Sequence, residues 1–178
     1  DAADTILVSY NFGDVLINEF LPRPTSLQAE FVELISFEEI DFTNWSITDK
    51  TYTLHHFNGR NVASAKFIIL SEDPAFATII PPEAYFIEVQ DFPSLNNYGD
   101  AIYLRDFTGT VIDSLIYTTW WDLATGKSTE KIHPEFVSND STGWGVSTDT
   151  TGMTPGRPNS VVAKNIDGAV LSDYLIST

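Results

Sequence analysis

The chain has 178 residues, with 25 Asp and Glu against 9 Lys and Arg, which gives a formal net charge of −16. Its length suits about one domain, and its charge repels phosphate backbones and anionic lipid surfaces, so nucleic-acid binding is not expected. The sequence has no cysteine, which excludes disulfides, thiolate zinc sites and cysteine nucleophiles, and it has no run apolar enough for membrane insertion.

Short apolar runs bounded by Gly, Pro, Asn and Asp recur along the chain and predict β-strands. In chain order the predicted strands are Val15–Leu21, Glu30–Ser36, Trp45–Thr48, Tyr52–His55, Lys66–Ser71, Tyr85–Val89, Ala101–Arg105, Thr110–Tyr117 and Thr129–Ile132. The best helix candidate is one short turn around Pro74–Thr78. Regular short strands, together with 13% aromatic residues, predict an all-β sandwich or barrel.

The segment from Asp106 to Thr110 predicts the tip of a hairpin. Asp106 opens a type I turn, and Gly109 takes the left-handed position of a three-residue loop. This register places Leu104 opposite Ile112. The preferred core face then carries Ile102, Leu104, Ile112 and Ile116, and the competing face carries Val111, Leu115 and Tyr117. A bulge would switch the chain from one face to the other.

Several short motifs follow one another in a specific order. They are Val15–Phe20, Glu30–Leu34, Asp41–Asp49, Asn97–Ser114, Ser128–Pro134, Gly143–Asp149 and Thr154–Ser160. Together they resemble a lamin-tail domain of the microbial kind. Two positions depart from the family pattern: Asn44 stands where glycine is usual, and Thr129 stands where an aliphatic residue is usual.

The resemblance implies an immunoglobulin-like β-sandwich that spans residues 14–160. Residues 1–13 would then form an N-terminal extension or edge strand, and residues 161–178 a C-terminal tail, linker or extra strand. Microbial members of this family resemble accessory modules of secreted or surface-attached multidomain proteins. We therefore expect a non-catalytic interaction or scaffolding module, extracellular or at the cell surface, whose partners are protein domains or surface glycan. Fold alone does not establish this function.

Carboxylates in apolar strands are the strongest candidates for a metal site. Glu19 and Glu33 lie in such runs, and calcium prefers oxygen ligands. The alternative interpretation is that these are buried carboxylates that cap backbone amides or pair with Arg60, Lys66 or Arg105. The sequence lacks an Asp-x-Asp-x-Asp-Gly calcium loop. An accessory domain of a metal-dependent hydrolase remains a further alternative.

Catalysis is not expected, because no nucleophile elbow, phosphate-binding loop or zinc spacing occurs. The adjacent Trp120 and Trp121 are candidates for ligand binding, because exposed indoles stack on sugars or anchor interfaces. The competing interpretation is that one of them covers the open end of the sandwich. Trp45 and Trp144 occupy positions expected in the core.

Overall fold

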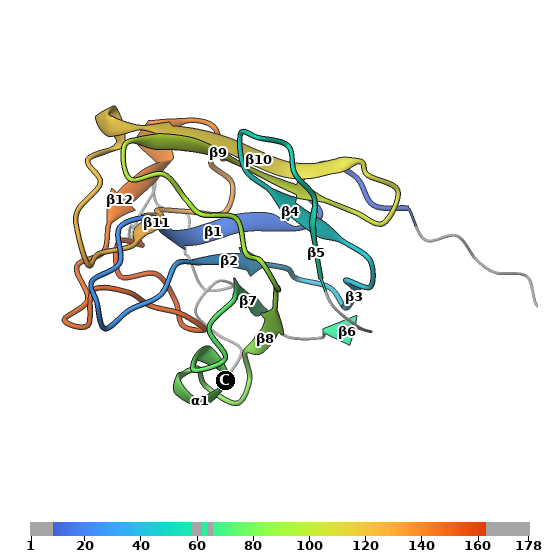
Figure 1. Ribbon diagram of the computed structural model, residues 1–178, viewed down its shortest axis with the longest axis horizontal. Coiled ribbons are helices and arrows are strands. Elements are labelled where there is room, and N and C mark those ends of the chain that lie inside the picture. Colours follow the sequence, from blue (N-terminus) through green and yellow to red (C-terminus); the bar gives the residue numbers. More distant parts are fainter. Residues whose placement is uncertain (1–8, 58–61, 64–65, 163–178) are drawn as a thin grey trace, which may run out of the picture.

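Two β-sheets packed face to face form the body of the protein (Figure 1). The computed structural model describes residues 9–57, 62–63 and 66–162. The larger sheet has the order β12-β11-β1-β2-β7-β8, and the smaller has the order β10-β9-β4-β5. All neighbouring strands run antiparallel except β7 and β8. This arrangement confirms the predicted all-β, immunoglobulin-like sandwich.

The strands are short, as expected from the spacing of turn residues. The larger sheet contains β1 (Leu16–Leu21), β2 (Phe31–Ile35), β7 (Phe67–Ser71), β8 (Tyr85–Glu88), β11 (Thr129–Lys131) and β12 (Trp144–Val146). The smaller contains β4 (Ser46–Thr48), β5 (His55–His56), β9 (Gly99–Arg105) and β10 (Val111–Thr118). A two-stranded ribbon pairs β3 (Ile40–Asp41) with β6 (Val62–Ala63). The helical elements are α1 (Phe76–Ile79) and 3₁₀ turns at Thr119–Trp121 and Ser141–Gly143.

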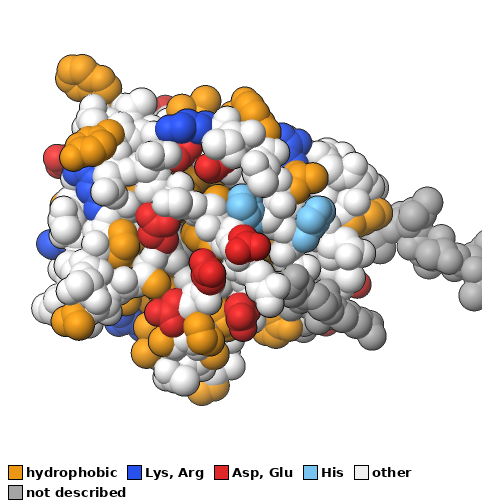
Figure 2. All heavy atoms as spheres, viewed as in Figure 1, with side chains coloured by type: hydrophobic (Ala, Val, Ile, Leu, Met, Phe, Trp, Pro, Cys, Tyr) orange, Lys and Arg blue, Asp and Glu red, His pale blue; other side chains and the backbone are white. Residues whose placement is uncertain are grey.

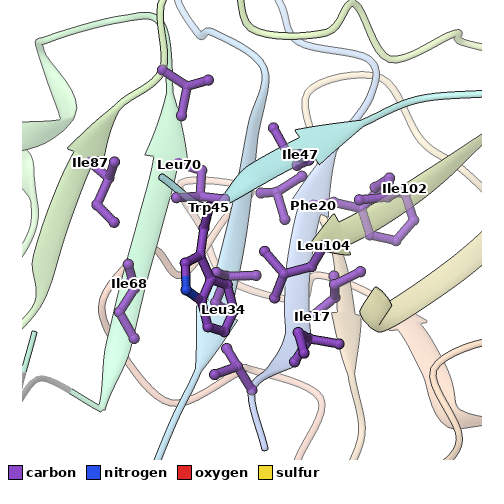
Figure 3. Packing of buried hydrophobic residues seen from close by; sticks show 14 of the residues in the cluster. Ile17, Phe20, Leu34, Trp45, Ile47, Ile68, Leu70, Ile87, Ile102 and Leu104 are labelled. Carbon is purple, nitrogen blue, oxygen red and sulfur yellow. The ribbon is translucent and has the colours of Figure 1, made fainter. Parts of the chain in front are cut away.

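The main core lies between the two sheets (Figure 3). Figure 3 shows Ile17, Phe20, Leu34, Ile68 and Leu70 from the larger sheet near Ile47, Ile102 and Leu104 from the smaller. Trp45 is fully buried and makes edge contacts with Phe42 and Tyr10, both at 4.9 Å between ring centroids. Trp144 is 8% exposed and lies against Phe20.

The larger sheet is buried on both faces. Its second face packs into a separate apolar cluster made of Leu21, Phe31, Ile35, Phe67, Ile69 and Phe76. Met153 and Val162, which come late in the chain, pack against this cluster. The C-terminal part of the described chain therefore covers the sheet from outside.

The predicted hairpin forms, but its register differs from the prediction. The Asp106 carboxylate accepts hydrogen bonds from the backbone amides of Thr108 and Thr110, and Gly109 has a φ of +85°. A bulge between Val111 and Asp113 places Asp113, not Ile112, opposite Leu104. The core on β10 consequently continues through Leu115 and Tyr117, and the expected inward position of Ile116 was wrong, because this side chain is half-exposed.

Local backbone geometry accounts for two further outcomes. The predicted strand Tyr52–His55 was mostly wrong, because Tyr52 has a φ of +60° and closes a turn onto the carbonyl of Asp49. Asn44, standing where the family has glycine, also adopts the left-handed region with a φ of +63°, which Asn tolerates better than most residues. The expected extra strands near residues 6–8 and 169–175 lie outside the described residues.

Candidate functional site

Three glutamates lie side by side across the larger sheet. Glu19 on β1 is directly opposite Glu33 on β2 and, on its other side, directly opposite Glu130 on β11. All three are fully buried. They occupy the sheet face opposite the main core, because their strand neighbours Phe20, Val32 and Leu34 face that core and side chains alternate along a strand. We call these three residues the carboxylate row.

A segment late in the chain, residues 154–161, covers the carboxylate row; we call this segment the strap. The Thr154 amide donates to Glu19 Oε1 at 2.8 Å, and the Gly156 amide donates to Glu33 Oε2 at 2.6 Å. The Val161 amide donates to Glu130 Oε2 at 3.2 Å. Each carboxyl group therefore accepts a backbone amide of the strap.

Side chains of the strap add further contacts. The Ser160 hydroxyl donates to Glu130 Oε2 at 2.8 Å. The Thr154 hydroxyl lies 3.0 Å from Glu19 Oε2 and 3.1 Å from Glu130 Oε1, so it sits between two carboxyl groups. At the other end of the row, the side-chain Nδ2 of Asn18 donates to Glu33 Oε1 at 2.7 Å.

Gly156 and Asn159 fix the path of the strap. Gly156 has a φ of +76°, and a Cβ atom there would lie 2.7 Å from Pro81 and 2.8 Å from Ala84. Glycine is therefore required by conformation and by space. The Asn159 side chain donates to the carbonyls of Asn18 at 3.0 Å and Lys131 at 2.8 Å, which ties the strap to β1 and β11.

Burial dominates the electrostatics of the row. Desolvation, with the neighbouring Glu130 charge, raises the pKa of Glu19 to about 7. Desolvation and the Glu19 charge raise the pKa of Glu33 well above its ordinary value. Among the described residues, no Lys or Arg forms an ion pair with any of the three glutamates. Within that part of the chain, the row is not compensated by positive charge.

The structure shows the amide-capping arrangement that was the alternative to a metal at Glu19 and Glu33. In the described part of the chain, no group of three or more His, Asp or Glu side chains is arranged to hold a metal ion. Of the predicted charge partners, Arg105 instead donates to the Gly109 carbonyl, and Arg60 lies outside the described residues. Sequence reasoning missed Glu130, although it alternates with Thr129 and Lys131 in a predicted strand.

A second buried polar group bridges the two sheets. Lys131 Nζ donates to the Ser138 hydroxyl at 2.6 Å, and that hydroxyl donates to Asp113 Oδ2 at 2.7 Å. Asp113 Oδ2 also accepts the Ile17 amide at 2.7 Å. Burial lowers the pKa of Lys131 to about 8 and raises the pKa of Asp113. A serine beside such a lysine resembles a nucleophile, but Ser138 is buried and both contacts of its hydroxyl are internal.

The two adjacent tryptophans have different environments. Trp121 packs against Phe20 and Trp144, at 6.3 Å and 5.9 Å between centroids. Trp120 is 91% exposed. The short turn that carries both begins at Thr118, whose hydroxyl accepts the Trp120 amide, and ends at Asp122 in the left-handed region. Trp121 therefore anchors the turn that presents Trp120.

A second exposed aromatic residue lies at the same end of the sandwich. The β9–β10 ladder ends with Gly99 opposite Thr118, so Tyr98 and the Trp120 turn extend from the same edge. Tyr98 is 78% exposed, and the Arg23 guanidinium lies 5.3 Å from its ring centroid. Arg23 also donates to the carbonyls of Asn97 and Leu123, one on each loop. We call Arg23, Tyr98 and Trp120 the aromatic end; sequence reasoning missed its first two members.

The remaining candidates are less organised. His55 and His56 lie on β5. His133 Nδ1 lies 3.9 Å from Glu135 Oε2. An open hollow of about 450 Å³ is lined by Glu30, Glu72 and Asp73 among others. Figure 2 shows acidic side chains gathered on the face near β7 and β8, in keeping with the net charge of −16.

Comparison with protein families gives a match to a large part of the chain. The family model described as Lamin Tail Domain matches residues 9–119, which is 111 of 178 residues. This span includes β1–β10 but ends before Trp120, Glu130 and the strap. A search of curated proteins finds no match. Within the described residues, no helix has the length and apolar character needed to cross a membrane.

Proposed function

Because the chain belongs to the lamin tail domain family, we propose that it is a non-catalytic interaction module of a secreted or cell-surface multidomain protein. We place its partner-binding surface at the aromatic end. The family has an immunoglobulin-like fold that suits such a role, and function on such a fold depends on the surface it presents.

The observation that carries this proposal is the exposure of Trp120 at the same end of the sandwich as Tyr98 and Arg23. Trp, Tyr and Arg are the residue types that most often dominate binding energy at interfaces. An indole that is 91% exposed contributes nothing to the core. The turn beneath it is held by Trp121, and the neighbouring loop is held by Arg23. A preorganised surface loses less conformational entropy on binding.

The interior supports a non-catalytic role. The buried ionisable groups are engaged in internal contacts: the carboxylate row holds the strap, and Asp113 with Lys131 bridges the sheets. Ser138, the hydroxyl closest to a lysine, is covered. A nucleophile needs access to substrate as well as a base within reach.

The experiment uses purified neighbouring domains of the parent protein as the binding partner, with affinity measured by calorimetry. Trp120→Ala and Tyr98→Ala should each weaken binding by about tenfold or more, as expected for hot-spot residues. Phe12→Ala is the matched control, because Phe12 is an exposed aromatic near the start of β10, at the other end of that strand. Equal effects of all three variants would contradict the placement of the surface.

A carbohydrate ligand is the second candidate, favoured by the accessible flat face of Trp120. An indole stacks on the apolar face of a sugar ring at low ordering cost. A glycan array with the intact chain tests this candidate, and Trp120→Ala should abolish binding without changing the fold. Trp121→Ala is not an equivalent test, because Trp121 packs on Phe20 and Trp144. Binding that survives Trp120→Ala would exclude this candidate.

A further inference from the structure

The carboxylate row and the strap have no part in the proposed binding surface. Three acids placed directly opposite one another in a sheet are unfavourable when ionised, since like charges across a strand pair repel. Here the repulsion acts in a fully buried site without an ion-pair partner in the described chain. An isolated buried charge is so costly that the group normally becomes neutral instead.

The number of hydrogens available at Thr154 is a second, independent indication that one acid of the row is protonated. Its hydroxyl lies within hydrogen-bonding distance of both Glu19 Oε2 and Glu130 Oε1. A hydroxyl has one proton to donate, and an ionised carboxylate only accepts. Its single proton can point fully at only one of the two oxygens, so the second contact is fully satisfied when a carboxyl group carries a proton and donates it to the Thr154 oxygen.

The second hydroxyl of the strap cannot relieve this shortage. Ser160 already donates to Glu130 Oε2 and accepts the Thr148 amide. Ser128 lies on the Glu19 side, and its hydroxyl donates to the Gly152 carbonyl at 3.3 Å. Neither supplies a hydrogen for the second contact of Thr154.

We propose that the carboxylate row is a proton-dependent latch for the strap. In the closed form at least one of Glu19, Glu33 and Glu130 is protonated, and loss of that proton releases residues 154–161 from the outer face of β1, β2 and β11. The strap is held to these glutamates by three backbone amides and two hydroxyl groups, so ionisation acts directly on its attachment.

The donors that hydrogen-bond to the row are uncharged: backbone amides, hydroxyl groups and the Asn18 carboxamide. β1 contributes Asn18, and β11 and its preceding loop contribute Ser128 beside Glu130. From the strap, Arg157 turns away to Asp149, at 3.6 Å, and to the Met153 carbonyl. Lys131 lies on the opposite sheet face with Ser138. No cation is thus available among these groups to neutralise an ionised row.

The expected opening range follows from burial of the carboxyl groups. The pKa of Glu19 is raised from 4.5 to about 7 in the closed form, so the latch should be held most firmly in acidic solution and should loosen progressively as the pH rises through that range. Opening would also remove Met153 and Val162 from the second apolar cluster. The exposed surface would include the outer face of three strands.

Hydrogen exchange measured on the intact chain tests the latch. We expect the protection factors of the Thr154, Gly156 and Val161 amides to fall by up to about tenfold per pH unit between about pH 5 and about pH 8, the limit for loss of one proton. Protection factors correct for the intrinsic pH dependence of exchange. Amides of the β9–β10 ladder serve as an internal reference and should remain protected.

Glu130→Gln is the decisive variant, because its carboxamide can donate to Thr154 Oγ1 without any bound proton. Its strap should lose less protection over this range than that of the unmodified chain, because one acid of the row can no longer ionise and Glu19 no longer faces the Glu130 charge. Glu88→Gln is the matched control, since Glu88 lies on the same sheet but is exposed; it should behave as the unmodified chain. If Glu130→Gln does not fold, Glu19→Gln is the substitute, again with one acid fewer in the row.

Carboxyl titration provides a second readout that does not depend on variants. With ¹³C-labelled glutamate, at least one buried carboxyl carbon should still report the protonated form at about pH 6, well above an ordinary glutamate. Two results would overturn the latch: protection of the strap that does not change with pH, or the same pH dependence in Glu130→Gln as in the unmodified chain.

Discussion

Glu19 and Glu130, separated by most of the chain, lie directly opposite each other on β1 and β11 and share the hydroxyl of Thr154. The contact joins the first strand of the larger sheet to a late strand and to the strap. It therefore ties these two strands to the strap at a fully buried site where two carboxyl groups face each other. Stability of the whole domain should respond to the protonation of this pair.

We predict that the domain loses stability as pH rises from about 5 to about 8. The folded-state pKa of Glu19 is about 7, above its ordinary value of 4.5, so the folded chain keeps a proton that the unfolded chain has released. The contribution is complete below the ordinary value and is lost as pH rises through the folded value, at roughly 1 kcal/mol per pH unit. Urea unfolding at several pH values measures it.

The prediction stops at about pH 8 because Lys131 has the opposite effect on stability above that pH. The pKa of Lys131 is lowered from 10.5 to about 8, so above pH 8 the folded chain loses this proton first and the domain becomes more stable as pH rises. Glu130→Gln should reduce the loss of unfolding free energy between about pH 5 and about pH 8, and Glu88→Gln should not. Unfolding free energies that stay level or rise between about pH 5 and about pH 8 would contradict the prediction.

The sequence predicts the fold well because its signals are local. Alternating apolar runs located β1, β2 and β7, and the Asp106 turn with Gly109 located the hairpin. The register failed at Asp113 for a non-local reason. This carboxylate accepts the Ile17 amide and the Ser138 hydroxyl, so the bulge that positions it depends on residues distant in sequence.

The candidate site was only half predictable. Glu19 and Glu33 stood out as acids within apolar strands, but Glu130 belongs to a strand of three residues and joins them only through the β1–β11 pairing. Likewise Trp120 was a candidate from sequence, whereas Tyr98 joins it because the β9–β10 ladder ends between them. Long-range pairing of this kind leaves no local pattern.

We predict that Trp144→Ala destabilises the domain by about 3–5 kcal/mol, the usual cost of truncating a buried large aromatic. Trp144 packs on Phe20 and Trp121, and its indole donates to the Ser138 carbonyl at 2.9 Å. The melting temperature measures the loss. Trp120→Ala is the control and should change it little, and comparable losses in both variants would show that exposure does not separate them.

We predict that calcium and chelator leave the melting temperature unchanged. The expectation of a metal at Glu19 and Glu33 came from their acidic character, but four of their oxygens accept protein donors in the closed structure. A cation would have to displace the strap. A calcium-dependent rise in melting temperature that is lost in Glu19→Gln, but kept in Glu88→Gln, would instead support the metal site.

We predict that Gly109→Val destabilises the hairpin by about 1–2 kcal/mol, the cost of the left-handed region for a residue with a Cβ atom. The φ of Gly109 is +85°, and in the described chain no atom beyond its sequence neighbours lies within 4 Å of the place a Cβ atom would take. Backbone strain and not collision would therefore cause the loss. Gly109→Asn separates the two, because Asn tolerates this region better than Val. The unfolding free energy should rank Gly, then Asn, then Val, and equal losses for Asn and Val would show that the turn is not limited by its backbone conformation.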